Sequence, residues 1–289
     1  MRIEDAQSIA ILGRQPALGI AELESLYGAD AVQPFGDHGC FITAAPEHID
    51  FARLGGSVRI GKVLTKLPST KWKDIESYIL QTSPQHAETI DGKLSFGISA
   101  FGPHFSARTV AKTALLTKKA VKAAGHSVRM VPHKDVSLGS AVVIHNKLTG
   151  PQGWELLVVS DGTSAYLAQT TSIQDIESYT ARDQARPHRD AKVGMLPPKL
   201  AQIIINLAVG QSDKKQLILD PFCGTGVLLQ EAMLMDYDIY GTDLEPRMVQ
   251  YSIDNLTWLD SHYPDVGDYR RVEVGDAATH QWHNAKDIT

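Results

Sequence analysis

The sequence predicts an α/β protein with at least two domains, and three observations support this prediction. Stretches with the period of strands alternate with stretches of helical period along the whole chain. The length of 289 residues exceeds that of most single domains. Towards the C-terminal end, the stretch "LILDPFCGTGVLLQEAM" joins an apolar strand, a glycine turn and a helix, which is typical of a parallel sheet with covering helices.

Roughly the first 65 residues are expected to form a small α/β unit in the order strand, helix, strand, helix, strand. Pro16 suits the first turn of a helix, and Gly28 ends that helix. The three strands are expected at residues 8–13, 40–44 and 58–67.

In the middle of the chain, residues 71–81 have a helical pattern and residues 93–102 a strand pattern. Ser106 is expected to cap a helix that runs to Ala124, where Gly125 stops it. Further strands are expected at residues 126–132, 141–148 and 154–160.

Residues 180–199 have no apolar period and are rich in proline, glycine and basic residues, so they are expected to be a linker. A helix is predicted from Pro198 through "KLAQIIINLA". A strand that ends in Asp220, the Gly-Thr-Gly turn, the helix "VLLQEAMLM" and two more short strands follow.

The net charge of −5 conceals an uneven distribution, with −3 over residues 1–90, +5 over 91–170, +1 over 171–199 and −8 over 200–289. No acid occurs from Gly92 to Lys134, against eight Lys or Arg. On the expected helix 106–124, the basic residues share an arc of about 120°, interrupted by Leu115. They are Arg108, Lys112, Lys118, Lys119 and Lys122. This face is either a polyanion-binding surface or a solvated helix face.

The first residues carry acids where a secretory signal would be apolar, and no apolar stretch is long enough to cross a membrane. Cys40 and Cys223 are few and far apart, which fits a reducing compartment. We therefore expect a cytoplasmic protein without a membrane partner.

The Gly224-Thr225-Gly226 turn lies between a strand end and a helix N-terminus, a place that suits an anion or a carboxylate. It is not a phosphate P-loop, because no Lys-Ser/Thr follows the glycines. It is also a poor dinucleotide motif, since Leu229 stands where a third glycine is expected.

Two more strands are also expected to end in acids, Asp243 and Asp276. An acid 23 residues after Asp220 could accept the hydroxyls of a ribose, and Asp276 could accept an adenine amino group. On one edge of a parallel sheet the three acids would form an adenosine-shaped pocket. The alternative is that each is a turn-forming acid at the end of its strand.

The motifs "DPFCGTG", "GTDLEP" and "GDA" resemble those of S-adenosylmethionine-dependent methyltransferases. The stretch "RDQARPHRDAKVGMLPPKLAQIIINLA" running into "LDPFCGTG" resembles the archaeal-type tRNA guanine-N2 methyltransferases, relatives of those that make N2-methylguanosine at position ten of tRNA. The resemblance covers the whole chain and is strongest from Tyr179 to Asp243.

The resemblance implies four segments. They are a ferredoxin-like N-terminal unit at 1–70, a THUMP-like RNA-binding domain at 71–172, a linker at 173–199 and a partial Rossmann-like methyltransferase domain at 200–289. It implies a tRNA partner, no DNA partner and S-adenosylmethionine as cofactor.

The implied cofactor residues hold the amino-acid end beside Asp220 and the Gly-Thr-Gly turn, the ribose at Asp243 and the adenine near Leu244. The full set is Asp220, Pro221, Phe222, Cys223, Gly224, Thr225, Gly226, Asp243, Leu244, Asp276 and Ala277. The RNA-binding set is the basic helix face with Arg182 and Arg186.

Several residues have two interpretations. Basic residues of the linker could touch RNA, brace the cofactor pocket or belong to a flexible segment; they are Arg182, Arg186, His188, Arg189 and Lys192. His280 and His283 have an H-x-x-H spacing but no third ligand, so a surface pair is favoured and no metal is expected. Cys223 is expected to be a packing residue rather than a nucleophile.

Exocyclic-amine methyltransferases carry an Asp/Asn-Pro-Pro-aromatic motif, whose acceptors bind the reacting amine. The 13 residues after Asp276 contain no such motif, and Pro197-Pro198 precedes the first helix of the domain. The catalytic residues are therefore expected beyond Thr289, and this chain is expected to be an inactive fragment of the enzyme.

Three other functions remain alternatives to a guanine-N2 methyltransferase. The first is a non-catalytic THUMP-type tRNA-binding protein with a degenerate methyltransferase domain. DNA adenine methylation would share the cofactor motifs, but the basic block disfavours it. A THUMP-containing sulfur-transfer enzyme would need a Ser-Gly-Gly pyrophosphate loop, which the sequence lacks. The modified nucleotide and the number of methyl groups are left open.

Overall fold

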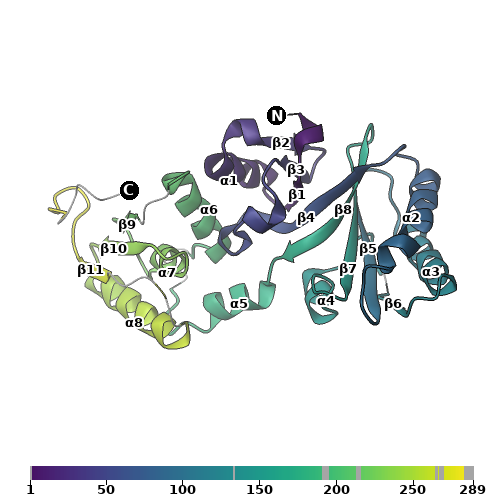
Figure 1. The fold of residues 1–289 in the computed structure, drawn as a ribbon. Helices are drawn as coiled ribbons and strands as arrows, with labels where there is room; N and C mark the ends of the chain where they lie inside the picture. Colours follow the sequence, from purple (N-terminus) through teal and green to yellow (C-terminus); the bar gives the residue numbers. More distant parts are fainter. Residues whose placement is uncertain are drawn as a thin grey trace. The chain divides into compact units, whose positions relative to one another are not determined.

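The structure is a computed structural model that describes residues 2–132, 134–190, 195–212, 216–263, 266 and 270–282. Its contacts divide the chain into two compact units. Unit 1 comprises residues 1–20, 29–52 and 57–175, and unit 2 comprises residues 21–28, 53–56 and 176–289. Both units combine a sheet with helices, so the predicted α/β class is confirmed (Figure 1).

Unit 1 is built on one eight-stranded sheet in the order β2-β3-β1-β4-β8-β7-β5-β6. Its strands are β1 (Ser8–Leu12), β2 (Val32–Phe35), β3 (Gly39–Ile42), β4 (Ser57–Lys66), β5 (Leu94–Phe101), β6 (Val128–Met130), β7 (Gly153–Ser160) and β8 (Ala165–Ile173). β5 runs parallel to β6 and β7, whereas the remaining pairs are antiparallel.

Strand β7 is buried on both faces, because its alternate residues enter different cores. Leu156 and Val158 pack with apolar residues of α2 (Trp72–Ala87) and α3 (Ala107–Ala123). Leu157 and Val159 pack with the core around β1, β2 and β3. α2 and α3 lie side by side over one end of this sheet (Figure 1).

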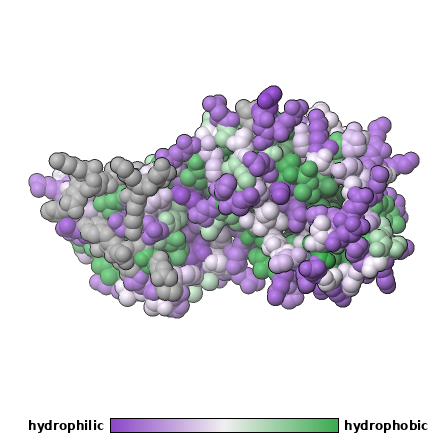
Figure 2. Space-filling model, in the orientation of Figure 1, coloured by the Kyte–Doolittle hydropathy of each residue, from purple (hydrophilic) through white to green (hydrophobic). Residues whose placement is uncertain are grey.

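The predicted cap of α3 is confirmed. The Ser106 Oγ accepts the backbone N–H of Thr109 at 3.3 Å, and Gly125 follows the helix with a φ of +93°. Hydrophilic side chains and smaller hydrophobic patches are interspersed over the face drawn in Figure 2.

Three sequence-based assignments in unit 1 are wrong. Residues 141–148 were expected to form a strand but contain the helix α4 (Ser140–His145), because Val143 packs against Val131, Leu138 and Leu148. The helix expected between the strands β3 and β4 is replaced by two single turns, η3 (Pro46–His48) and η4 (Phe51–Arg53). β2 and β8 were not anticipated; the first contains a proline and the second contains the polar run 169–172.

Unit 2 has a three-stranded parallel sheet in the order β11-β10-β9. The strands are β9 (Leu217–Asp220), β10 (Asp238–Asp243) and β11 (Arg270–Val274). Its helices are α5 (Ile176–Gln184), α6 (Pro198–Val209), α7 (Val227–Leu234) and α8 (Pro246–His262). Apolar residues of α6, α7 and α8 close one core with the strands, among them Ile205, Leu229, Leu256 and Ile239. The predicted alternation of parallel strands and helices is confirmed.

Residues from the N-terminal part of the chain complete unit 2. Helix α1 (Pro16–Tyr27) contributes Glu22, whose buried carboxylate accepts the backbone N–H groups of Gly55 and Gly56, each at 2.9 Å. The same carboxylate accepts the Nδ2 of Asn206 on α6 at 2.7 Å. Burial raises the pKa of Glu22, and these hydrogen bonds partly offset the cost of its charge. A Cβ at Gly55 would overlap the carbonyl oxygen of Lys199, so only glycine permits this approach to α6.

The expected linker contains ordered structure. α5 covers residues 176–184, and the part of the linker that the structure describes makes hydrogen bonds to α7 and α8. A search of the described residues finds no helix with the length and apolar character that a membrane crossing requires.

Candidate functional site

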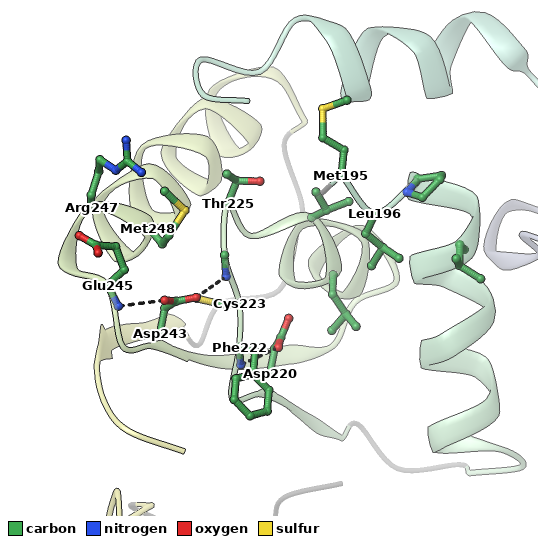
Figure 3. A pocket seen from close by; sticks show the side chains of 15 residues that line it. Met195, Leu196, Asp220, Phe222, Cys223, Thr225, Asp243, Glu245, Arg247 and Met248 are labelled. Carbon is green, nitrogen blue, oxygen red and sulfur yellow. Dashed lines mark hydrogen bonds between the residues drawn. The ribbon is translucent and has the colours of Figure 1, made fainter. Parts of the chain in front are cut away.

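The carboxyl edge of the unit 2 sheet holds a cleft of about 740 Å³, which we call the edge pocket (Figure 3). β9 and β10 end at this edge in Asp220 and Asp243, as predicted. Between β9 and α7 run residues 221–226, which we call the glycine loop. The pocket therefore lies where parallel strands end and a helix begins, which is the usual place of a ligand in such sheets.

Six of the predicted cofactor residues line the edge pocket. They are Asp220, Phe222, Cys223, Gly224, Thr225 and Asp243. The sequence had suggested them one by one, and the fold brings them together.

Asp243 ties the end of β10 to the glycine loop. Its Oδ2 accepts the backbone N–H of Gly224 at 2.9 Å, and its Oδ1 accepts the backbone N–H of Glu245 at 3.0 Å (Figure 3). Each carboxylate oxygen has a second lone pair, so the group can still accept hydrogen bonds from a ligand.

Asp220 lies at the floor of the same pocket, where its Oδ1 accepts the N–H of Phe222 at 3.1 Å. Burial raises the pKa of the Asp220 carboxyl, and the negative charge of Asp243 raises it further. Two neighbouring carboxylates in a partly desolvated pocket favour a ligand that brings positive charge or hydrogen-bond donors.

Cys223 faces the interior, where it packs with Leu229, Ile239 and Leu256. Burial raises the pKa of its thiol to about 12, and the nearby charge of Asp220 acts in the same direction. Since the thiolate is the nucleophilic form, this environment suits a packing residue and disfavours covalent catalysis.

The two glycines of the loop adopt positive φ angles, +53° at Gly224 and +81° at Gly226. Gly226 has an additional constraint, because a Cβ there would overlap the Oγ of Ser252 on α8. The turn therefore requires glycine both for its backbone and for its contact with α8.

Five predicted cofactor residues are not among the described residues that line the edge pocket: Pro221, Gly226, Leu244, Asp276 and Ala277. Leu244, between the lining residues Asp243 and Glu245 in the sequence, is 72% exposed. β11 ends at Val274 rather than at Asp276, and the Asp276 carboxylate accepts the N–H of Ala278 at 2.9 Å. Asp276 thus makes the same kind of hydrogen bond, to the backbone N–H two residues further on, that Asp220 makes to Phe222 and Asp243 makes to Glu245.

The opposite wall of the pocket comes from the segment before α6 and its first turn, where Met195 and Leu196 lie across the cavity from Asp220 and Cys223 (Figure 3). The sequence suggested Pro197-Pro198 only as a candidate for the catalytic motif, and its position before the first helix of the domain excluded that role. The further lining residues that sequence reasoning missed are Met195, Leu196, Pro197, Leu200, Val227, Leu228, Glu245, Arg247 and Met248. The available signal was the apolar stretch "MLPPKL" at the end of the charged linker.

The linker arginines are held inside unit 2. Arg182 makes a two-pronged ion pair with Glu231 of α7, with Nε–Oε1 and Nη2–Oε2 distances of 2.9 Å and 3.1 Å. Arg186 is 4% exposed, and burial lowers its pKa. Both arginines thus belong to the packing of unit 2, beside α7, and neither lines the edge pocket. Lys192 lies outside the described residues.

The basic face of α3 is in unit 1. Arg108, Lys112, Lys119 and Lys122 are exposed, and Lys118 is half-buried. Lys112 lies 3.4 Å from Glu76 of α2, an exposed pair of small energetic value. Val110, Ala114 and Val121 form the buried side of the helix, so the basic residues face outward as predicted.

His280 is half-buried, with its Nε2 2.9 Å from the hydroxyl of Tyr240 and 3.2 Å from Glu273. It is thus a member of a side-chain cluster with β10 and β11. His283 lies outside the described residues. Within the part of the chain that the structure describes, no group of three or more possible ligands could hold a metal ion.

Comparisons with known proteins match the part of the chain that forms the edge pocket. Residues 186–262 match the family model of the RMKL-like methyltransferase domain. The tRNA (guanine(10)-N2)-dimethyltransferases of Methanothermobacter thermautotrophicus, Pyrococcus abyssi and Methanocaldococcus jannaschii are 43%, 43% and 34% identical over 76, 82 and 112 residues. These segments are 26%, 28% and 38% of this chain but only 22%, 22% and 30% of the relatives' own lengths.

Two solved structures resemble the fold. TrmN from Thermus thermophilus has a TM-score of 0.51 at 18% identity, covering 93% of this chain and 73% of that one. A possible methylase from Clostridium difficile 630 has a TM-score of 0.51 at 13% identity, covering 96% and 78%. At these identities the likeness concerns the fold alone. Residues 186–262 of unit 2 thus resemble the RMKL-like methyltransferase domain, and the expected family resemblance is confirmed over the matched segments.

Proposed function

We propose that this chain is part of an S-adenosylmethionine-dependent tRNA methyltransferase that acts on the exocyclic N2 of a guanosine. The edge pocket carries the proposal, because Asp220, Asp243 and the glycine loop meet there at the ends of parallel strands. The matched methyltransferase domain and the names of the relatives support the choice of reaction and substrate.

In this proposal the ammonium group of the cofactor's amino-acid end binds near Asp220, whose pKa is raised by burial and by the charge of Asp243, so that a cation there would stabilise the carboxylate. The ribose hydroxyls donate to the Asp243 carboxylate, which the N–H groups of Gly224 and Glu245 hold in place. Met195 and Leu196 cover the opposite side of the ligand. Leu244, Asp276 and Ala277 would border the adenine at the outer part of the same sheet edge.

Bound S-adenosylmethionine supplies an electrophilic methyl group, so the chain needs no nucleophile of its own. The residues of the edge pocket hold the cofactor and exclude water, and alignment with the target amine determines the rate. None of the 289 residues forms the Asp/Asn-Pro-Pro-aromatic motif that would accept hydrogen bonds from that amine. No catalytic role is therefore assigned to a residue of this chain.

The proposed partner is folded tRNA, bound through phosphate contacts of the basic α3 face in unit 1. Such contacts recognise charge and shape rather than sequence. The acid-free basic block favours this polyanion, and the names of the relatives favour tRNA over DNA. The free cysteines Cys40 and Cys223 fit the reducing cytoplasm, which is the proposed location.

A first experiment tests the cofactor by calorimetric titration of this chain with S-adenosylmethionine, with ATP and NAD as competitors. Saturable binding that neither competitor removes is expected. A second experiment incubates the protein from its complete coding sequence with unmodified tRNA and labelled cofactor, followed by nucleoside analysis. Label in N2-methylguanosine is expected. tRNA binding without transfer would instead indicate the non-catalytic tRNA-binding alternative, and label in duplex DNA would contradict the proposed substrate.

A further inference from the structure

Asn255 of α8 joins three parts of unit 2 through one buried carboxamide. The residue has no exposed surface. Its Nδ2 donates to the carbonyl oxygen of Thr225 in the glycine loop at 2.8 Å and to the carbonyl oxygen of His188 at 3.0 Å. Its Oδ1 accepts the backbone N–H of His188 at 2.9 Å. The side chain thus binds both backbone groups of one residue and a third group 30 residues away in the sequence.

This pattern of partners requires asparagine. Two carbonyl oxygens need two donors, and one N–H needs an acceptor, which is the set that a carboxamide offers. An aspartate would direct a carboxylate oxygen at both carbonyls, and a glutamine would be one methylene too long for the same geometry. In a buried site an unmatched partner costs free energy, so the hydrogen-bond pattern is specific.

Neighbouring contacts also hold the segment around His188 against α8. The imidazole of His188 stacks on Tyr251 at 4.1 Å with an interplanar angle of 6°, and its Nε2 lies 2.8 Å from Asp254. The backbone carbonyl of Asn255 accepts from Gln230 of α7 at 3.3 Å. Consecutive turns of α8 therefore hold the segment around His188, the glycine loop and the helix that follows this loop.

We propose that Asn255 is the positioning residue of the edge pocket, which couples the glycine loop to the segment around His188. The inference rests on the proposed function in one respect, since it takes S-adenosylmethionine as the ligand. Thr225 lines the pocket, whereas Asn255 and His188 do not belong to its lining. Asn255 therefore acts on the ligand through the backbone that it holds, and not by contact.

Hydrogen–deuterium exchange on the unaltered chain gives the first test. S-adenosylmethionine should slow exchange in a peptide containing the His188 amide together with that of the glycine loop, because both are fixed by one side chain. If the glycine loop becomes protected and the His188 peptide does not change, the coupling is refuted. If neither region responds because the ligand does not bind in calorimetry, the proposed function fails, which is a distinguishable result.

The variant Asn255→Asp gives the second test. At pH 8 its carboxylate would oppose the carbonyls of Thr225 and His188, and the dissociation constant for S-adenosylmethionine should rise about tenfold or more relative to the unaltered chain. At pH 6 burial favours the protonated acid, which regains one donor, so the ratio of the two constants should shrink. Asn146→Asp, at the half-buried C-cap asparagine of α4 in unit 1, is the matched control and should keep a ratio near one at both pH values, because its Nδ2 also donates to a backbone carbonyl but lies outside unit 2.

These titrations are carried out at temperatures at which circular dichroism shows each variant to be folded. A residue with a merely structural role would lower the unfolding temperature and leave the constant of the folded molecules unchanged. A ratio near one for Asn255→Asp at both pH values would overturn the proposal. Should this variant not fold, the exchange experiment alone decides between the two outcomes.

Discussion

Replacement of Asp243 by alanine tests the assignment of the edge pocket most directly. The change removes the carboxylate that is proposed to accept the ribose hydroxyls, and it also frees the N–H groups of Gly224 and Glu245. Hydrogen bonds to a charged group contribute about 1.5–3 kcal/mol. At about 1.4 kcal/mol for each tenfold change, the affinity for S-adenosylmethionine should fall about 10- to 150-fold.

Calorimetric titration of the two proteins measures this difference. Asp260→Ala is the matched control, because Asp260 is an exposed acid of the same unit that does not line the pocket. Its affinity should equal that of the unaltered chain. Asp243→Asn adds a separate comparison, since it removes the charge while keeping the size of the side chain. An unchanged dissociation constant for Asp243→Ala in folded protein would show that the ribose is bound elsewhere.

Three further changes have defined outcomes. Asp220→Asn should stabilise the ligand-free chain near neutral pH. Because the pKa of the Asp220 carboxyl is raised in the folded chain, the unaltered protein loses stability as the pH rises through that pKa. In urea titrations the gain in the free energy of unfolding should vanish below the ordinary pKa of 3.8, and the affinity for S-adenosylmethionine should fall at neutral pH. Arg182→Met should lower the free energy of unfolding by about 3–5 kcal/mol in the same assay, since it leaves the buried Glu231 without this ion pair. A second change, Glu231→Met, should recover most of that loss. A triple change to glutamate on α3 should weaken tRNA binding and flatten its salt dependence in filter assays. The residues are Lys118, Lys119 and Lys122; the charge-matched control triple is Lys66, Lys71 and Lys73, and equal effects of both triples would contradict a specific α3 face.

Local patterns were sufficient to predict most of the elements and the floor of the pocket. Ser106 and Gly125 mark the ends of α3 because capping depends on the adjacent backbone. Asp220, the glycine loop and Asp243 were found because parallel strands place their carboxyl ends on one edge. In these cases the sequence signal and the physical cause are close together in the chain.

The errors have non-local causes. Residues 141–148 have an apolar stretch suitable for a strand, but contacts of Val143 with residues of separate segments select a helix. β8 pairs with β4 over a sequence separation that no local pattern reveals. The apolar wall at Met195 and Leu196 becomes part of the pocket only when α6 packs beside α7.

Asn255 shows why such a residue escapes sequence reasoning. In the sequence it is one polar residue of an amphipathic helix. Its position in the helix alone does not distinguish a buried residue that binds several backbone groups from a surface residue. Its role depends on two backbone segments, at His188 and Thr225, that lie 67 and 30 residues before it in the chain.

The charge of the edge pocket provides an argument about the ligand. Asp220, Asp243 and Glu245 line it together with one cation, Arg247, whose guanidinium lies 3.4 Å from Asp190. The acids therefore outnumber the available positive charge in the described lining. A dinucleotide or nucleoside triphosphate would bring further negative charge to these carboxylates, whereas S-adenosylmethionine brings a sulfonium and an ammonium group. The electrostatics of the pocket thus favour the cationic cofactor, because the acids that line it exceed the positive charge that Arg247 supplies.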